Sequence, residues 1–167
     1  SDAGVLKRLD ASLVGGGLVL QVVSTTKTAI FSVTSGSYTD LTGLSVSITP
    51  SSSSNKILVL VNLNAVGQDN QTFWKVVRAS TDISVGATAG SRTVTSGGNM
   101  YNESDGANIK NNSLNFLDSP STTSATTYKI QIYSRSGATH VNRSSADTDN
   151  ADYGRSASTI TLIEIAG

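Results

Sequence analysis

The 167-residue chain carries 12 basic and 12 acidic side chains, so its formal net charge is zero, and only 14% of its residues are charged. This balance excludes the basic surface that nucleic-acid-binding proteins need and offers no acidic surface to cations. The length is that of one domain with at most a short tail. Because the sequence has no cysteine, disulfides and thiolate chemistry are excluded.

The N-terminal segment, residues 1–14, is the only part of the sequence that predicts a helix. Asp2 is a candidate cap, and Gly15, Gly16 and Gly17 end the pattern and favour a hinge. Four apolar residues share one face of this helix: Val5, Leu6, Leu9 and Leu13. A helix this short is marginal alone in water, so we expect residues 1–17 to be an anchor that docks on another surface; a frayed leader is the alternative.

No targeting or membrane segment is predicted. The first apolar stretch is short and carries Lys7 and Arg8, unlike a signal peptide. No apolar run reaches the length of a membrane span. We therefore expect a soluble protein that is made in the cytoplasm and does not insert into a membrane.

Residues 18–167 predict a single β domain. Short runs of alternating or continuous apolar residues are separated by Gly, Ser, Asn and Pro, which are turn residues. The predicted strands are Leu18–Val23, Ile30–Val33, Leu44–Ile48, Lys56–Ala65, Phe73–Ala79, Leu114–Leu117, Tyr128–Arg135 and Thr159–Ile165. Many short strands without a helical crossover indicate an all-β antiparallel sandwich, with a jelly roll as the expected topology.

Two of these strands, Lys56–Ala65 and Thr159–Ile165, are apolar on both faces. The outer face of an antiparallel sandwich usually meets water, so a second apolar face needs a cover. We expect either a neighbouring subunit or one of the chain's own loops. The candidate oligomer-interface residues are Leu58, Leu60, Ile160 and Leu162.

The single tryptophan, Trp74, is expected to fill the core, with sugar stacking as the alternative. Residues 80–112 have no sustained pattern, which is typical of a functional or mobile stretch. The polar segment from His140 to Arg155 is expected to be a loop.

The sequence offers little catalytic machinery. A Ser/His/Asp triad would have to use the only histidine, His140, and no nucleophile-elbow motif is present, so we expect no enzyme and no cofactor. Three closely spaced carboxylates, Asp147, Asp149 and Asp152, are weak calcium candidates because calcium prefers clustered oxygen ligands. They lack the glycine and distal glutamate of an EF-hand loop, and ordinary turns are the alternative.

Four segments resemble a recurring module of tailed bacteriophages, particularly those of marine bacteria and cyanobacteria. The segments are VLQVVSTTKT (19–28), YTDLTGLSVSITPSSSSNKILV (38–59), NFLDSPSTTSATTYKIQ (115–131) and VNRSSADTDNADYGRSASTITLIEI (141–165). The most specific pieces are Leu117–Pro120 and the stretch from Asn142 to Arg155. The resemblance implies a trimeric jelly roll at the distal end of tail fibres and related virion appendages, with variable loops for host recognition and no catalytic residues.

The resemblance therefore predicts a virion structural protein that attaches to the host surface. The expected partners are further copies in a homotrimer, other virion proteins through residues 1–17, and a host-surface polysaccharide. Candidate binding residues in loops are Tyr101, Asn102, Arg143 and Tyr153, for which solvated or inter-subunit positions are the alternative. Capsid or head decoration without a receptor, and a carbohydrate-binding module, are the alternative functions. The chain would be either a piece of a long fibre or a small complete protein.

Overall fold

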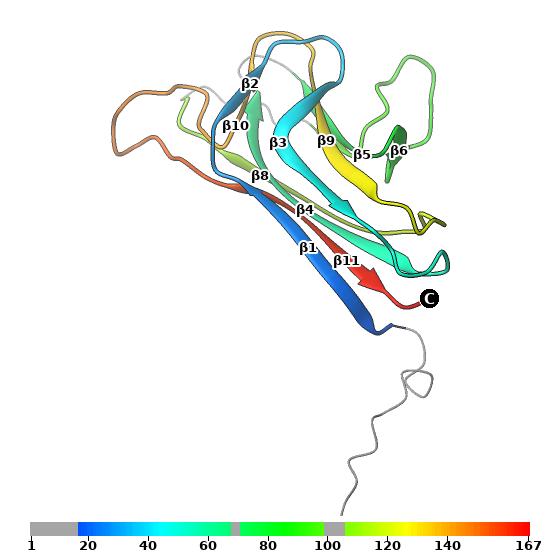
Figure 1. The fold of residues 1–167 in the computed structure, drawn as a ribbon. Helices are drawn as coiled ribbons and strands as arrows, with labels where there is room; N and C mark the ends of the chain where they lie inside the picture. The colour runs from blue at the N-terminus through cyan, green and yellow to red at the C-terminus, as the bar shows by residue number, and fades with distance from the viewer. Residues whose placement is uncertain (1–16, 68–70, 99–105) are drawn as a thin grey trace, which may run out of the picture.

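The computed structural model describes residues 17–67, 71–98 and 106–167, and every regular element in these ranges is a β-strand (Figure 1). The predicted helix over residues 1–14 lies outside the described residues. The strands are β1 (Val19–Lys27), β2 (Phe31–Val33), β3 (Thr39–Ile48), β4 (Lys56–Gly67), β5 (Thr72–Arg78), β6 (Thr81–Ile83), β7 (Gly97–Gly98), β8 (Lys110–Asp118), β9 (Thr126–Ser134), β10 (Thr139–Val141) and β11 (Ser158–Ile165). In the described ranges no helix has the length and apolar character needed to cross a membrane.

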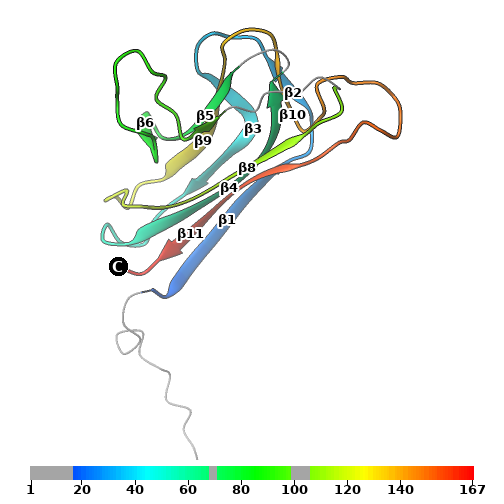
Figure 2. The same cartoon turned by 180° about the vertical axis from the view of Figure 1, so that it is seen from behind.

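The strands form two antiparallel sheets that pack face to face (Figures 1 and 2). The first sheet has the order β1, β11, β4, β8. The short strand β10 pairs with β4 beyond the end of β11, and β2 pairs in turn with β10. The second sheet has the order β3, β9, β5, with β6 and β7 both pairing along the free edge of β5. This alternation of strands between two sheets is the jelly-roll topology, which confirms the predicted fold class.

Alternation along the strands builds the core between the sheets. In β4 every second residue from Ile57 to Ala65 is buried, and β9 and β11 bury Tyr128, Ile130, Ile160 and Leu162 in the same way. Trp74 is 1% exposed and lies in this core, so the prediction of a core-filling role is confirmed. Because the pleat sends successive side chains to opposite faces, alternate residues of each strand lie together in the core.

Several expected boundaries were wrong. β8 begins at Lys110, inside the stretch expected to be irregular, because its Asn and Ser residues pair with β4 although they carry little apolar signal. The expected loop from His140 to Arg155 begins instead with the last two residues of β10, His140 and Val141, which are buried between β2 and β4. In β8 the pairing with β4 overrides the weak strand propensity of asparagine, whereas β10 has only three residues, too few to show an alternating pattern.

A buried polar contact joins the two sheets at one end. Asp118, at the end of β8, accepts hydrogen bonds from Arg78 Nη1 at 2.7 and 2.8 Å and from the Tyr128 hydroxyl at 2.7 Å. Arg78 and Tyr128 belong to the opposite sheet. Burial and the hydrogen bond to Asp118 raise the pKa of Tyr128, so the phenol stays a donor. The Leu117–Pro120 motif thus supplies a carboxylate that joins the sheets.

A second buried carboxylate, Glu164, is 1% exposed and lies beneath the β3–β4 loop. Burial raises its pKa, but hydrogen bonds from Asn55 Nδ2 and from the backbone N–H and hydroxyl of Ser51 outweigh burial, so the pKa lies below its ordinary value. The ionised form is therefore the one that the folded chain holds.

This lowered pKa predicts acid sensitivity. A carboxyl group whose pKa is lower in the folded chain than in the unfolded chain stabilises the fold at pH values above its unfolded-state pKa. This stabilisation is lost as the pH falls through the pKa of the group in the folded chain. We expect the urea midpoint to drop between about pH 6 and about pH 3 and the Glu164→Gln variant to show a flatter profile. Identical pH profiles for the two proteins would contradict this role.

A glycine pair in β7 lies directly against two aromatic side chains of β5, the core residue Trp74 and the half-buried Phe73. A Cβ at Gly97 would lie 2.6 Å from Trp74 Nε1 and 2.9 Å from its Cε2, and a Cβ at Gly98 would lie 2.3 Å from a Phe73 ring carbon. Neither position has the positive φ that would itself require glycine. Close approach to Trp74 and Phe73 therefore explains both glycines.

The Gly97→Ala variant is expected to lose about 1–3 kcal/mol of unfolding free energy because the buried indole must move. Gly86→Ala is the matched control, since a Cβ there meets nothing within 4 Å. Urea denaturation of both variants measures the difference. Equal stability of the two variants would show that β7 does not press on Trp74.

Candidate functional site

The outer face of the first sheet carries a row of apolar side chains that no described part of the chain covers. The strand register places one residue from each of four strands at the same level, because Val22 pairs with Ile163, Ile163 with Leu58, and Leu58 with Leu117. Val22 is 57% and Leu117 53% exposed. We call Val22, Ile163, Leu58 and Leu117 the apolar band. Contiguous exposed apolar surface of this kind marks interaction sites.

The same face becomes polar with distance from the apolar band. The next levels carry Ser24, Thr161, Leu60 and Asn115, and then Thr26, Thr159, Asn62 and Ser113. Further along, Asn111 donates hydrogen bonds to Asn62 Oδ1 and, at 3.0 Å, to Asn64 Oδ1. We call Asn62, Asn64 and Asn111 the amide cluster.

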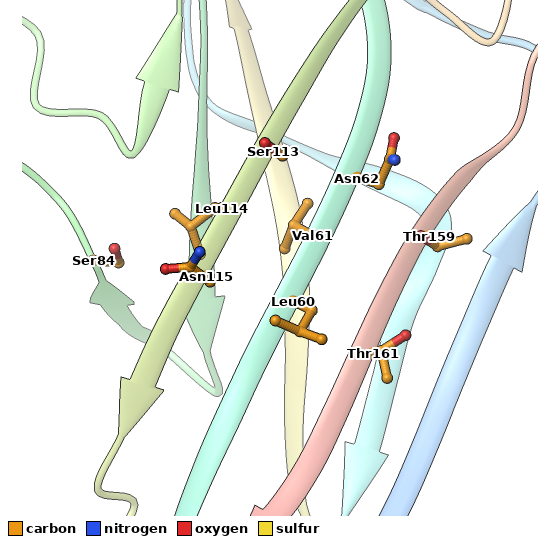
Figure 3. A pocket seen from close by; sticks show the side chains of 9 residues that line it. All are labelled: Leu60, Val61, Asn62, Ser84, Ser113, Leu114, Asn115, Thr159 and Thr161. Carbon is orange, nitrogen blue, oxygen red and sulfur yellow. The ribbon is translucent and has the colours of Figure 1, made fainter.

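A groove of about 660 Å³ runs across this face between the apolar band and the amide cluster (Figure 3). Its lining comes mainly from neighbouring positions of β4, β8 and β11: Leu60, Val61, Asn62, Ser113, Leu114, Asn115, Thr159 and Thr161. Ser84, which follows β6 in the other sheet, adds to the lining at the β8 edge. The groove has no charged residue in its lining, which combines hydroxyl and amide groups with Leu60, Val61 and Leu114. It could hold a ligand by hydrogen bonds and apolar contacts, but it has no acid, base or nucleophile pair for catalysis.

The outer face of the second sheet has a different composition. Lys75 and Lys129 form ion pairs there, at 2.7 Å each, with Asp82 and Asp40. Gln131 also donates to Asp40, and the Tyr38, Tyr133 and Phe73 rings pack together with centroids 5.7 and 6.0 Å apart. This is the mixed, charged surface expected of a sheet that faces water.

By contrast, the first sheet has no charged residue on its outer face between the level of Val22 and that of Asn64. All of these positions fall within the described ranges. Charged residues are depleted at the centres of protein interfaces. The difference between the two outer faces therefore singles out the first sheet as the candidate interaction surface.

Two of the four predicted interface residues were wrong. Leu58 and Leu60 lie half-buried on the outer face, as expected, but Ile160 and Leu162 are fully buried in the core. The other half of β11, Ile163 and Ile165, faces outward instead. Because β11 is apolar on both faces, its sequence pattern does not show which set of alternate residues faces the core. In the structure the inward set is the one that contains Ile160, Leu162 and the hydrogen-bonded Glu164.

The segment after β10 is built around a buried asparagine. Asn142 has a φ of 62°, its side-chain Nδ2 donates to the backbone carbonyls of Lys27 and Ala29, and its side-chain Oδ1 accepts from the Ser158 hydroxyl. These bonds tie the loop to the β1–β2 connection and to β11. Asn142 is therefore an architectural residue of the stretch that carried the phage resemblance.

Arg143, a predicted surface-binding residue, is mostly enclosed, with its side chain 12% exposed. Its Nη2 lies 2.7 Å from His140 Nδ1, which is also 2.8 Å from the Ser32 hydroxyl. A guanidinium only donates, so Nδ1 accepts. Burial and the Arg143 charge lower the pKa of His140, so the imidazole is neutral and held in place.

The acidic stretch forms a shallow pocket of about 240 Å³ that includes Tyr153. Its remaining lining is polar: Asp147, Thr148, Asp149, Asn150 and Arg155. Asp147 pairs with Arg155 and Arg143, and the contact with Arg155 lowers the pKa of its carboxyl. Asp149 and Asp152 are exposed. Among the described residues no three carboxylate, histidine or cysteine groups come together as a metal site.

Several predicted site residues lie outside the described ranges, namely Tyr101, Asn102, Val5, Leu6, Leu9 and Leu13. Sequence reasoning missed Val22, Ile163 and Leu117, which complete the apolar band. Each of these residues lies in a strand that was predicted at least in part. Their alignment at one level follows from the pairing register of the strands, which a local sequence pattern does not give.

Fold and surface together define a jelly-roll β-sandwich with one uncharged, partly apolar outer face. No model of a known protein family matches the chain, and no curated protein matches it significantly.

Proposed function

We propose that the chain is a structural module of a tailed-bacteriophage virion, a fibre or appendage domain that self-associates and takes part in host-surface attachment. The observation that carries the proposal is the outer face of the first sheet, where Val22 and Leu117 of the apolar band are exposed and no charged residue lies between the level of Val22 and that of Asn64. Burying such a face against further copies removes apolar area from water at about 25 cal/mol per Å². A homotrimer is the state that the segment resemblance implies.

The arrangement of the chain ends suits a displayed module. Gly17 N donates to Ala166 O at 3.1 Å, so the start of the described chain lies beside its C-terminal end (Figure 1). The segment with Arg143 and Tyr153 lies at the opposite end of the sandwich, next to β2 and β10. Attachment at the Gly17 end would therefore leave that loop end free.

A host-surface polysaccharide is the proposed ligand class at the loop end. Tyr153 offers an aromatic ring beside hydroxyl, amide and carboxylate groups in the small polar pocket. Sugars present the complementary combination of apolar C–H faces and hydroxyl groups. Weak sites of this kind gain strength when several copies bind together, which links this role to self-association.

The proposal is tested by locating the protein on purified virions of the phage that encodes it, using cryo-electron microscopy with an antibody to the chain. Density on a fibre or appendage, together with adsorption of purified protein to host cells, is the expected result. Rebinding to stripped particles without adsorption to cells would assign a capsid or head decoration role. Absence of the protein from virions would overturn the proposal.

A further inference from the structure

The apolar band and the amide cluster lie at different heights along the strands, and this order restricts how copies can meet. Leu58 and Asn62 lie two levels apart on β4, with Leu60 between them. Hydroxyl groups of β1 and β11 share the levels of Leu60 and Asn62, and Ser24 and Thr161 are hydrogen-bonded at 2.8 Å. The face is thus apolar at the end near the termini and polar at the other.

From this pattern we infer that copies of the chain assemble cyclically around an axis parallel to the strands of the first sheet. This inference rests on the self-association proposed above. Rotation about such an axis does not change the position of a residue along the strand direction. The apolar band of one copy therefore meets the apolar bands of the others, and the amide clusters likewise meet one another. Closed point-group symmetry is the rule for soluble homo-oligomers.

The alternative face-to-face pairing has a twofold axis that crosses the strands. It reverses the order of the levels about the axis. When the whole face is buried, the axis lies at the middle of the face, at Leu60, and Leu58 then lies against the Asn62 level of the partner copy. Apolar side chains would then cover amides, and burying an amide without a hydrogen-bond partner is unfavourable. The height-preserving arrangement buries the apolar band and leaves the amides to bond with one another or with water.

The composition and size of the face fit a second copy. Between the levels of Val22 and Asn64 the face carries no charge, and the nearest charged group, Lys56, lies one level beyond the apolar band and donates to Ser119 Oγ, so a partner of opposite charge has little to recognise. With strands about 4.8 Å apart and outward residues about 6.8 Å apart, the face has a projected area on the order of 500 Å². This is the greater part of the roughly 800 Å² per subunit that a specific interface buries.

One consequence is that all copies point the same way. The hydrogen bond from Gly17 N to Ala166 O places both ends of the described chain beside the apolar band. In a height-preserving assembly every Gly17 lies at one end of the particle and every segment 142–157 at the other. Such one-sided display is what an appendage module needs.

Cysteine crosslinking tests the direction of the axis, since the natural chain has no cysteine to interfere. Leu58→Cys and Asn62→Cys each place one thiol on the outer face of β4, and Thr127→Cys on the exposed face of β9 is the control. The full chain is treated with a short bis-maleimide. One cysteine variant carries a mass tag, so mixed pairs separate from like pairs on denaturing gels.

We expect strong 58–58 and 62–62 crosslinks, 58–62 pairs only as a small minority, and no product from Thr127→Cys. Predominant 58–62 pairs in a protein that remains oligomeric would overturn the inferred axis and leave self-association standing. A monomer by light scattering, without crosslinks, would overturn both. Circular dichroism of each variant establishes that the compared proteins are folded.

Discussion

The Val61→Asp variant is expected to be unfolded. Val61 is 3% exposed at the centre of β4, between the two sheets, and no cationic group lies among the core residues around it. An unpaired carboxylate there costs several kcal/mol. A domain has only about 5–15 kcal/mol of stability in total. Far-ultraviolet circular dichroism and urea titration measure the loss, and a cooperative transition at the wild-type midpoint would contradict this placement of β4.

The adjacent residue provides the matched control. Leu60 lies on the same strand but faces outward, beside Thr161 and Asn115. Leu60→Asp keeps its carboxylate in contact with water in the separated subunit, so the fold is expected to survive. Unfolding of both variants to the same extent would show that the two faces of β4 are equally enclosed.

The Asp118→Ala variant is expected to lose about 3–5 kcal/mol of unfolding free energy, the cost of breaking a buried ion pair from one side. The substitution leaves Arg78 and the Tyr128 hydroxyl without the carboxylate that both contact. Urea denaturation at neutral pH measures the change.

The exposed ion pair on the other sheet is the control for Asp118. Asp82, whose side chain is 39% exposed, pairs with Lys75 at 2.7 Å, and Asp82→Ala should cost less than about 1 kcal/mol. A loss at Asp118 no larger than at Asp82 would mean that the contact between the sheets does not stabilise the sandwich.

The fold class could be predicted because period-two alternation and turn residues carry it locally. The strands Phe73–Ala79, Tyr128–Arg135 and Thr159–Ile165 were each predicted to within two residues of β5, β9 and β11. β10 and the first part of β8 were missed. Their residues are held by pairing with β4, which is distant in sequence, and Asn and Ser have low strand propensity.

The candidate site was predicted only in part. Alternation placed Leu58 and Leu60 on the correct face of β4, yet the same reasoning assigned the wrong half of β11. Which half is inside depends on Glu164 and its partners Ser51 and Asn55, which lie more than a hundred residues earlier in the chain. Alignment of the apolar band across four strands is likewise a property of register, and register is set by the whole sheet.

The enclosed position of Arg143 has a similar origin. Its guanidinium lies against His140 and near Asp147, and Ser32 completes the contact from a strand far away in sequence. A polar residue in a Ser- and Asn-rich segment gives no local sign of burial. Asp118 and Asn142, which lie in the segments that suggested the resemblance, prove to hold the sandwich together.

The central claim, that the uncharged outer face of the first sheet joins copies of the chain, is tested most directly by sedimentation equilibrium of the full chain beside its Leu58→Asp variant. We predict a discrete oligomer for the natural chain and a folded monomer for Leu58→Asp, because a carboxylate in the apolar band would be buried without a partner. A natural chain that sediments as a monomer at micromolar concentration, or an oligomer unchanged by Leu58→Asp, would contradict it.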